Sequence, residues 1–179
     1  MITTHDPFLF LSKFAATLGF IVERVPRSIL VRPEGVTTDV AATFDGVMVR
    51  VCDALTPDVA LFLAAHTLGH CQQWAACPAS RLLNPADPAL NLTVTQRVAL
   101  ALCQEQDANE YATAFLHGAM PALSAANLSR IEALAAQDWT SFATFLGAQN
   151  VPRIQFHRAP RKLLPAGPVV DLAAAFDLS

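Results

Sequence analysis

Residues 56–74 read TPDVALFLAAHTLGHCQQW, and this stretch predicts the helix around which the rest of the chain is organised. Thr56 supplies a hydroxyl cap, and Pro57 suits the first helical position because its missing N–H would have no partner there. Asp58 places a carboxylate near the positive end of the helix dipole. The apolar residues that follow extend the predicted helix to about Trp74.

The region before this helix predicts a short helix and a hairpin. Asp6-Pro7 is typical of a helix start, and residues 20–25 read as a strand. Residues 40–44 and 47–52 flank Asp45-Gly46, a dipeptide that favours a type I′ turn because both central residues need a positive φ. These patterns predict an antiparallel hairpin directly before the organising helix.

The region after it predicts further helices. Thr93 and Gln96 have the spacing of a capping box, so a long helix is expected over residues 94–117. The next helix starts at Ser129 or, alternatively, near Ser124, and Asp138 is expected to cap a separate short helix.

The predicted fold class is α+β, a small antiparallel sheet with a hairpin packed on a helical core. One domain is expected over residues 1–156. Residues 157–179 form a C-terminal tail, which carries Pro160, Pro165 and Pro168 and is expected to be loose or partner-dependent.

Composition excludes several classes of protein. Of the 179 residues, 53% are hydrophobic and 15% charged, which excludes a disordered chain. The net charge of −3 argues against direct binding of nucleic acid. No apolar run approaches the length of a membrane span, and the N-terminus lacks the pattern of a signal peptide, so a cytoplasmic location with no membrane contact is expected. The four cysteines form no CxxC pair and read as small buried hydrophobes.

The chemistry-bearing pattern is the pair His66 and His70. Residues at i and i+4 lie about 40° apart around a helix and roughly 6 Å apart along it, so both imidazoles can reach one tetrahedral metal ion. The alternative is two unrelated histidines on one helix face, one buried and one solvated.

A third ligand is expected from the long helix over residues 94–117. Glu105 and Asn109 form a polar pair on an otherwise apolar stripe, which indicates a buried polar site. The alternative for Glu105 is a surface acid, and Asp107 is the reserve candidate for the third ligand. Cys71 directly follows His70 but points about 100° away from it, which favours a core role over a redox or metal-binding one.

In order and spacing, these features resemble the ImmA/IrrE-type metallo-endopeptidases, a zincin-like family. The resemblance rests on the hairpin strand over residues 46–52, AHTLGH at 65–70 and EQDANEYA at 105–112, followed by Met120-Pro121. It implies a zincin-like helical core that binds zinc. It also implies a protein partner or protein substrate, such as a phage or mobile-element transcriptional regulator.

Carried over residue by residue, the resemblance implies zinc ligation by His66, His70 and Glu105. Asn109 would orient one histidine by hydrogen bonding its free ring nitrogen. The chain departs from the family at Thr67, which stands where the family has its general-base glutamate. A threonine hydroxyl cannot accept a proton near neutral pH, so Thr67 marks a missing catalytic base.

Three functions therefore remain open. The first is a zinc-binding metallopeptidase-like protein, a pseudoenzyme with reduced or lost peptidase activity. The second is an active zinc-dependent peptidase with a non-standard base, for which His117 and His157 are distant candidates. The third is a metal-free protein-interaction domain in which the two histidines are relics.

Overall fold

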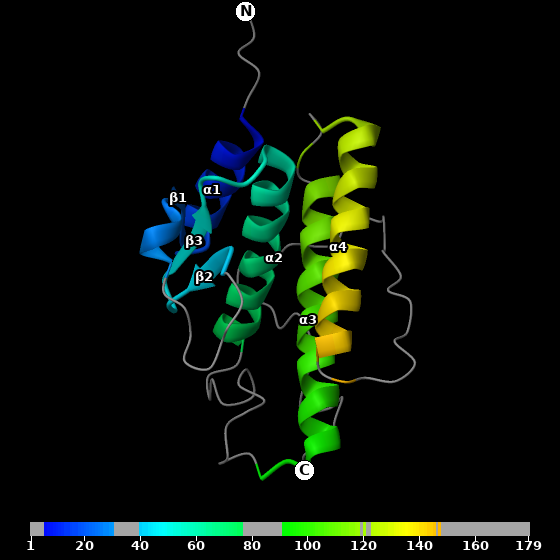
Figure 1. Cartoon of the computed structure of the whole chain (residues 1–179). Coiled ribbons are helices and arrows are strands. Elements are labelled where there is room, and N and C mark those ends of the chain that lie inside the picture. The colour runs from blue at the N-terminus through cyan, green and yellow to red at the C-terminus, as the bar shows by residue number, and fades with distance from the viewer. Residues whose placement is uncertain are drawn as a thin grey trace, which may run out of the picture.

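The computed structural model describes residues 6–30, 40–76, 91–118, 120, 123–145 and 147. Four α-helices, a 3-10 turn and three strands make up this part of the chain (Figure 1). In chain order they are α1 (Pro7–Thr17), β1 (Ile21–Val25), η1 (Arg27–Ile29), β2 (Ala42–Phe44), β3 (Met48–Cys52), α2 (Pro57–Ala76), α3 (Val94–Gly118) and α4 (Ala125–Phe145). The predicted α+β class is confirmed. The tail over residues 157–179 lies outside the described residues.

The three strands form one mixed sheet in the order β1-β3-β2. β2 and β3 pair antiparallel as the predicted hairpin, with Phe44 opposite Val49. β1 pairs parallel to β3, with Ile21 opposite Met48, so the sheet is not antiparallel throughout as expected. β3 occupies the centre, where it pairs with one strand on each edge, and its Val49 and Val51 are fully buried.

The hairpin lies where Asp45-Gly46 predicts it, but its turn is not type I′. Gly46 has a φ of +99°, whereas Asn91 is the one non-glycine among the described residues with a positive φ. The Asp45 carboxylate accepts hydrogen bonds from the amides of Val47 at 3.2 Å and Met48 at 2.8 Å. These side-chain bonds hold the loop, so Asp45 needs no left-handed conformation.

Helix caps fall close to the positions that the sequence predicts. The Asp6 carboxylate accepts from the amide of Phe8 at 2.9 Å. At the start of α3, the amide of Gln96 donates to the Thr93 hydroxyl at 3.2 Å, and the Thr93 amide donates to the Gln96 side chain at 2.9 Å. This reciprocal pair is the predicted capping box.

α4 is one helix rather than the expected two. The Ser124 hydroxyl accepts from the amide of Asn127 at 3.2 Å, so the helix begins at the earlier of the two predicted positions. Ser129 and Asp138 lie inside it and cap nothing. The reason is a buried stripe with a spacing of four residues, which runs without a break through Ile131, Ala135, Trp139 and Ala143. Burial of that stripe outweighs the capping preference of single residues.

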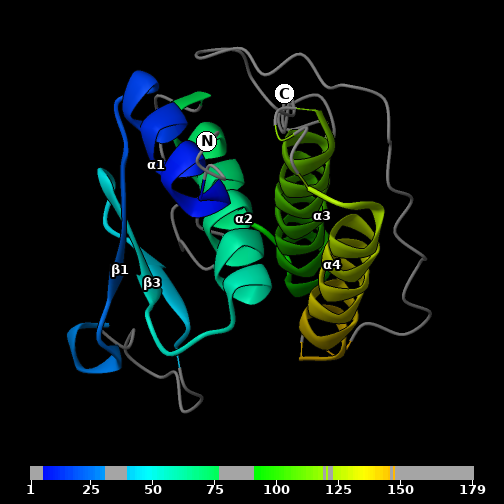
Figure 2. The same cartoon turned by 90° about the horizontal axis from the view of Figure 1, so that it is seen from above.

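α2 lies between two layers, with α1 and the sheet on one side and α3 and α4 on the other (Figure 2). The apolar core runs through this arrangement and includes Leu11, Val49, Leu68 and Phe115, all fully buried. Because α2 is covered from both sides, polar side chains on its α3-facing surface are buried with it. None of the described helices is long and apolar enough to cross a membrane.

Candidate metal centre

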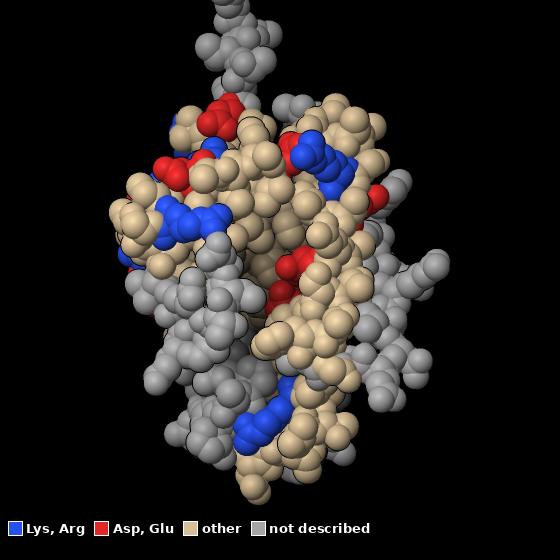
Figure 3. Space-filling model, viewed as in Figure 1, with Lys and Arg blue, Asp and Glu red and all other residues tan. Residues whose placement is uncertain are grey.

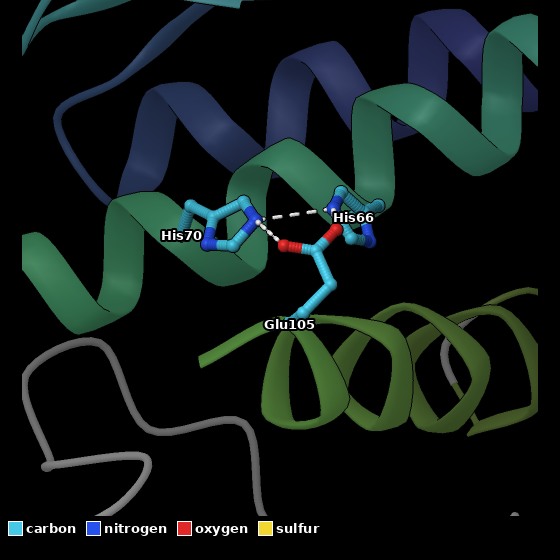
Figure 4. A group of neighbouring side chains, drawn as sticks. All are labelled: His66, His70 and Glu105. Atoms are coloured by element: carbon cyan, nitrogen blue, oxygen red, sulfur yellow. Dashed lines mark hydrogen bonds and ion pairs between the residues drawn. The ribbon is translucent and has the colours of Figure 1, made fainter. Parts of the chain in front are cut away.

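Two helices supply the predicted ligands. His66 and His70 project from α2 toward Glu105 on α3 (Figure 4). The helices approach closely here: a Cβ added to Gly69 would lie 2.9 Å from the Cα of Ala108. Glycine thus removes the side chain that would separate α2 from α3, and both imidazoles come within reach of the glutamate.

The three side chains converge through their outermost atoms. His66 Nε2 lies 3.1 Å from Glu105 Oε1, and His70 Nε2 lies 3.4 Å from Glu105 Oε2. The two Nε2 atoms are 3.1 Å apart. Ligand atoms that each sit about 2.0–2.1 Å from a tetrahedral ion lie roughly 3.3–3.4 Å from one another. The spacing of the donor atoms therefore suits a single small metal ion.

An amide fixes the ring orientation of His66. Its Nδ1 faces Asn109 Oδ1 at 3.2 Å, so the hydrogen bond expected of Asn109 is present. The Asn109 Nδ2 group donates to Asp138 Oδ2 at 3.1 Å. Because the amino end of this amide is directed to a carboxylate, its oxygen faces the histidine, and Nδ1 of His66 must carry the hydrogen.

A second amide does the same for His70. Its Nδ1 lies 2.9 Å from Gln73 Oε1. Gln73 Nε2 donates to the carbonyl of Gln104 at 2.8 Å and to Asp107 Oδ2 at 3.1 Å. Asp107, the reserve candidate for the third ligand, is thus bonded to Gln73 and is not in the converging group.

These bonds leave both Nε2 atoms with lone pairs that point at each other and at a carboxylate. Three such acceptors at van der Waals distance repel unless a positive charge lies among them. The donor set of two imidazoles and one carboxylate is one that metal ions accept, and the group could hold a metal ion.

Without a metal, the members of the group shift one another's pKa values. Burial alone would lower the pKa of His70, but the hydrogen bond and negative charge of Glu105 outweigh it and raise that pKa. Burial would raise the pKa of Glu105, but its hydrogen bonds to His66 and His70 hold it well below its usual range. A metal ion and a proton therefore compete for the ring nitrogen of His70.

The site is acidic and open on one side. The side chain of His66 is 8% exposed, whereas that of His70 is 32% exposed. Acidic side chains gather in a hollow between α2 and the α3–α4 pair (Figure 3). Burial raises the pKa of Asp138, and the neighbouring negative charge of Glu105 adds to the rise.

Thr67 takes no part in the convergence. Its hydroxyl donates to the carbonyl of Leu63 at 2.8 Å, one turn earlier on the same helix. His117 pairs with Glu132 between α3 and α4, at 3.0 Å. His157 lies outside the described residues. Neither Thr67 nor His117 thus supplies a proton acceptor among the three converging side chains.

Two residues of the site were missed by sequence reasoning. Gln73 had a usable signal, since it lies three residues after His70 and shares its helix face. Asp138 had none, because its position predicted a helix cap. Cys71 is fully buried, and burial raises the pKa of its thiol far above the usual range, in line with the expected core role.

A scan against protein-family models and searches of curated proteins and of solved structures find no match to this chain. The case for a metal centre thus rests on the geometry of the chain itself.

Proposed function

We propose that this chain is a zinc-binding, metallopeptidase-like protein whose peptidase activity is reduced or lost and which binds or acts on a protein partner. The observation that carries the proposal is the convergence of His66 Nε2, His70 Nε2 and the Glu105 carboxylate, whose two oxygens lie 3.1 and 3.4 Å from the two ring nitrogens. Two histidines and a glutamate are a known donor set of catalytic zinc sites, which keep a fourth position open.

Bound zinc would act there as a Lewis acid toward a carbonyl oxygen. The chain's own residues hold the ligands and screen one side of the site from water. At Thr67, however, a hydroxyl bonded to the Leu63 carbonyl replaces the carboxylate that the resembled family uses as base. General-base help is worth about 10²–10⁴-fold in rate, so its loss supports weak or absent hydrolysis.

The partner follows from the same resemblance. We expect the partner to be a protein such as a transcriptional regulator of a phage or mobile element, and the binding to take place in the cytoplasm. The net charge of −3 and the acidic hollow argue against direct binding of nucleic acid.

The first test is zinc binding. The full chain is stripped with a chelator, reloaded and measured for zinc content and affinity. One zinc ion per chain is expected in the wild type and none in His66→Ala. A wild type that binds no zinc would contradict the proposal and favour the metal-free interaction domain.

The second test restores the carboxylate. Zinc-loaded wild type and Thr67→Glu are assayed against candidate regulator proteins, with His66→Ala as the metal-free control. Thr67→Glu should raise cleavage by about 10²–10⁴-fold, and glutamate has a slightly better helix propensity than threonine.

A second candidate function is an active zinc peptidase with a non-standard base. Asp138 favours it, since this carboxylate adjoins Glu105 without belonging to the converging group. Robust cleavage by the wild type, unimproved by Thr67→Glu and lost in His66→Ala, would decide for this alternative.

A further inference from the structure

We infer that Asp138 on α4 is a positioning residue of the metal centre, which acts through Asn109 to keep the Nε2 lone pair of His66 directed at the ion. This inference rests on the proposed function, because it concerns the affinity of that site for zinc. It assigns α4 a part in a centre whose three ligands all come from α2 and α3.

The argument begins with the two possible orientations of the Asn109 amide. In the observed one, Oδ1 faces His66 at 3.2 Å and Nδ2 donates to Asp138 at 3.1 Å. In the reversed one, Nδ2 would donate to His66 Nδ1. The hydrogen of the neutral ring would then sit on Nε2, where it blocks the lone pair that a metal needs.

Asp138 decides between the two orientations. A carboxylate oxygen accepts the hydrogen bond from Nδ2, whereas the reversed amide would turn Oδ1 toward it and set two acceptors against each other. Asn109 is 0% exposed, so bulk water does not reach it to compensate. The Asp138 carboxylate therefore fixes the amide, and the amide fixes the imidazole.

The other histidine provides an internal comparison. Gln73, which orients His70, donates its amino group both to the backbone carbonyl of Gln104 and to Asp107. A backbone carbonyl remains when a side chain is replaced, so His70 keeps its orientation without Asp107. Loss of the Asp138 carboxylate should therefore lower the zinc affinity more than loss of the Asp107 carboxylate.

The test compares matched amide substitutions in the full chain. Asp138→Asn keeps the shape but lets the Asn109 amide turn over. Asp107→Asn makes the equivalent change beside Gln73. Glu132→Gln is the control, because Glu132 is a partly buried acid on the same helix whose carboxylate contacts His117. Zinc affinity is measured by competition with a chromophoric chelator.

Asp138→Asn should weaken zinc binding by about 10- to 100-fold, the usual effect of losing a partner of a ligand histidine. Asp107→Asn should lose less, and Glu132→Gln should match the wild type. Equal affinity of Asp138→Asn and wild type would overturn the inference and leave the proposed function intact. Failure of the wild type itself to bind zinc would overturn the proposed function.

A double variant separates positioning from a merely structural role. Asn109→Asp combined with Asp138→Asn exchanges the acid and the amide, so that a carboxylate accepts directly from Nδ1 of His66. This variant should recover zinc affinity to within about threefold of the wild type or exceed it, because a carboxylate partner makes the imidazole a stronger ligand. A folded double variant that stays at least about 10-fold weaker would overturn the inference, even if Asp138→Asn alone fails to fold.

Nitrogen-15 NMR of the histidine rings gives a readout independent of affinity. In the zinc-loaded wild type, His66 should carry its hydrogen on Nδ1. A hydrogen on Nε2 of His66, with Nδ1 toward the metal, would overturn the inference directly.

Discussion

Two histidine–glutamate clusters lie between helices of this chain, one at His66, His70 and Glu105 and the other at His117 and Glu132. Their contacts are alike in length, 3.1 Å from His66 to Glu105 and 3.0 Å from His117 to Glu132. They are also alike in burial, with side chains 8% and 13% exposed in the first pair and 15% and 14% in the second.

The clusters differ in the number of potential metal ligands that they bring together. Within the described part of the chain, the first is the one group in which three potential metal ligands meet. It is also the one in which an amide occupies Nδ1 of each ring and directs Nε2 inward. A close histidine–glutamate contact by itself is thus no metal site, whereas a third donor together with fixed ring orientation gives a group that could hold a metal ion.

The largest effect should come from removal of a ligand. His66→Ala or His70→Ala should weaken zinc binding by more than about 100-fold, since loss of an outer partner alone costs about 10- to 100-fold. His117→Ala is the matched change in the other cluster and should bind as the wild type does. Zinc titration of the three variants checks this, and equal losses in all three would erase the distinction between the clusters.

Zinc should also stabilise the folded chain, since the site joins α2 to α3. At a free zinc concentration about 1,000 times Kd, the free energy of unfolding should rise by about 4 kcal/mol. For a chain of this size that is a rise in Tm of roughly 10 °C. Thermal unfolding with and without zinc measures it. Glu132→Gln should keep the full shift and Glu105→Gln should lose most of it; a shift retained in Glu105→Gln would place the stabilising zinc elsewhere.

Gly69→Ala tests the close approach that makes convergence possible. The new Cβ would lie 2.9 Å from the Cα of Ala108, so backbone must move. Overpacking of this kind costs about 1–3 kcal/mol, partly offset by about 1 kcal/mol of better helix propensity. Denaturant unfolding should show the net loss and zinc titration a weaker site, while the His117–Glu132 contact, which does not involve α2, should persist. Unchanged zinc affinity would mean that the helices need not be this close.

The smallest effect is a graded dependence on pH. Glu105 raises the pKa of His70 above its ordinary value near 6.5, so a proton occupies this ring in the metal-free protein below that raised pKa. Zinc must displace it, and its affinity should fall by about tenfold per pH unit per displaced proton as the pH drops through this window.

In the metal-free chain, the folding stability depends on pH in the opposite direction to the zinc affinity. The raised pKa of His70 contributes stability that is present at low pH and is lost as the pH rises through that pKa. Calorimetric titrations from pH 6 to 8, in buffers of different ionisation enthalpy, would detect the released proton. The slope should be the same in His117→Ala, and zinc affinity that is independent of pH would contradict the assignment of His70 as a ligand.

The sequence by itself determined the features that follow from short spacings. The capping box at Thr93 and Gln96 located the start of α3 at Val94, and the helix predicted over residues 94–117 ends one residue later, at Gly118. Helical periodicity placed His66 with His70, and Glu105 with Asn109, on common faces. These inferences hold because neighbours within one or two turns have positions fixed by backbone geometry alone.

Only the tertiary structure decided which residues of different helices and strands contact one another. Asp138 has the residue type of a helix cap, yet burial of the α4 stripe keeps it inside the helix and turns it toward Asn109. In the same way, β1 pairs parallel to β3, a strand that it does not adjoin in the sequence, and this pairing puts β3 at the centre of the sheet. Such contacts depend on how apolar faces pack, which is a property of the whole core, so no local pattern around Asp138 could have revealed its place beside the candidate metal centre.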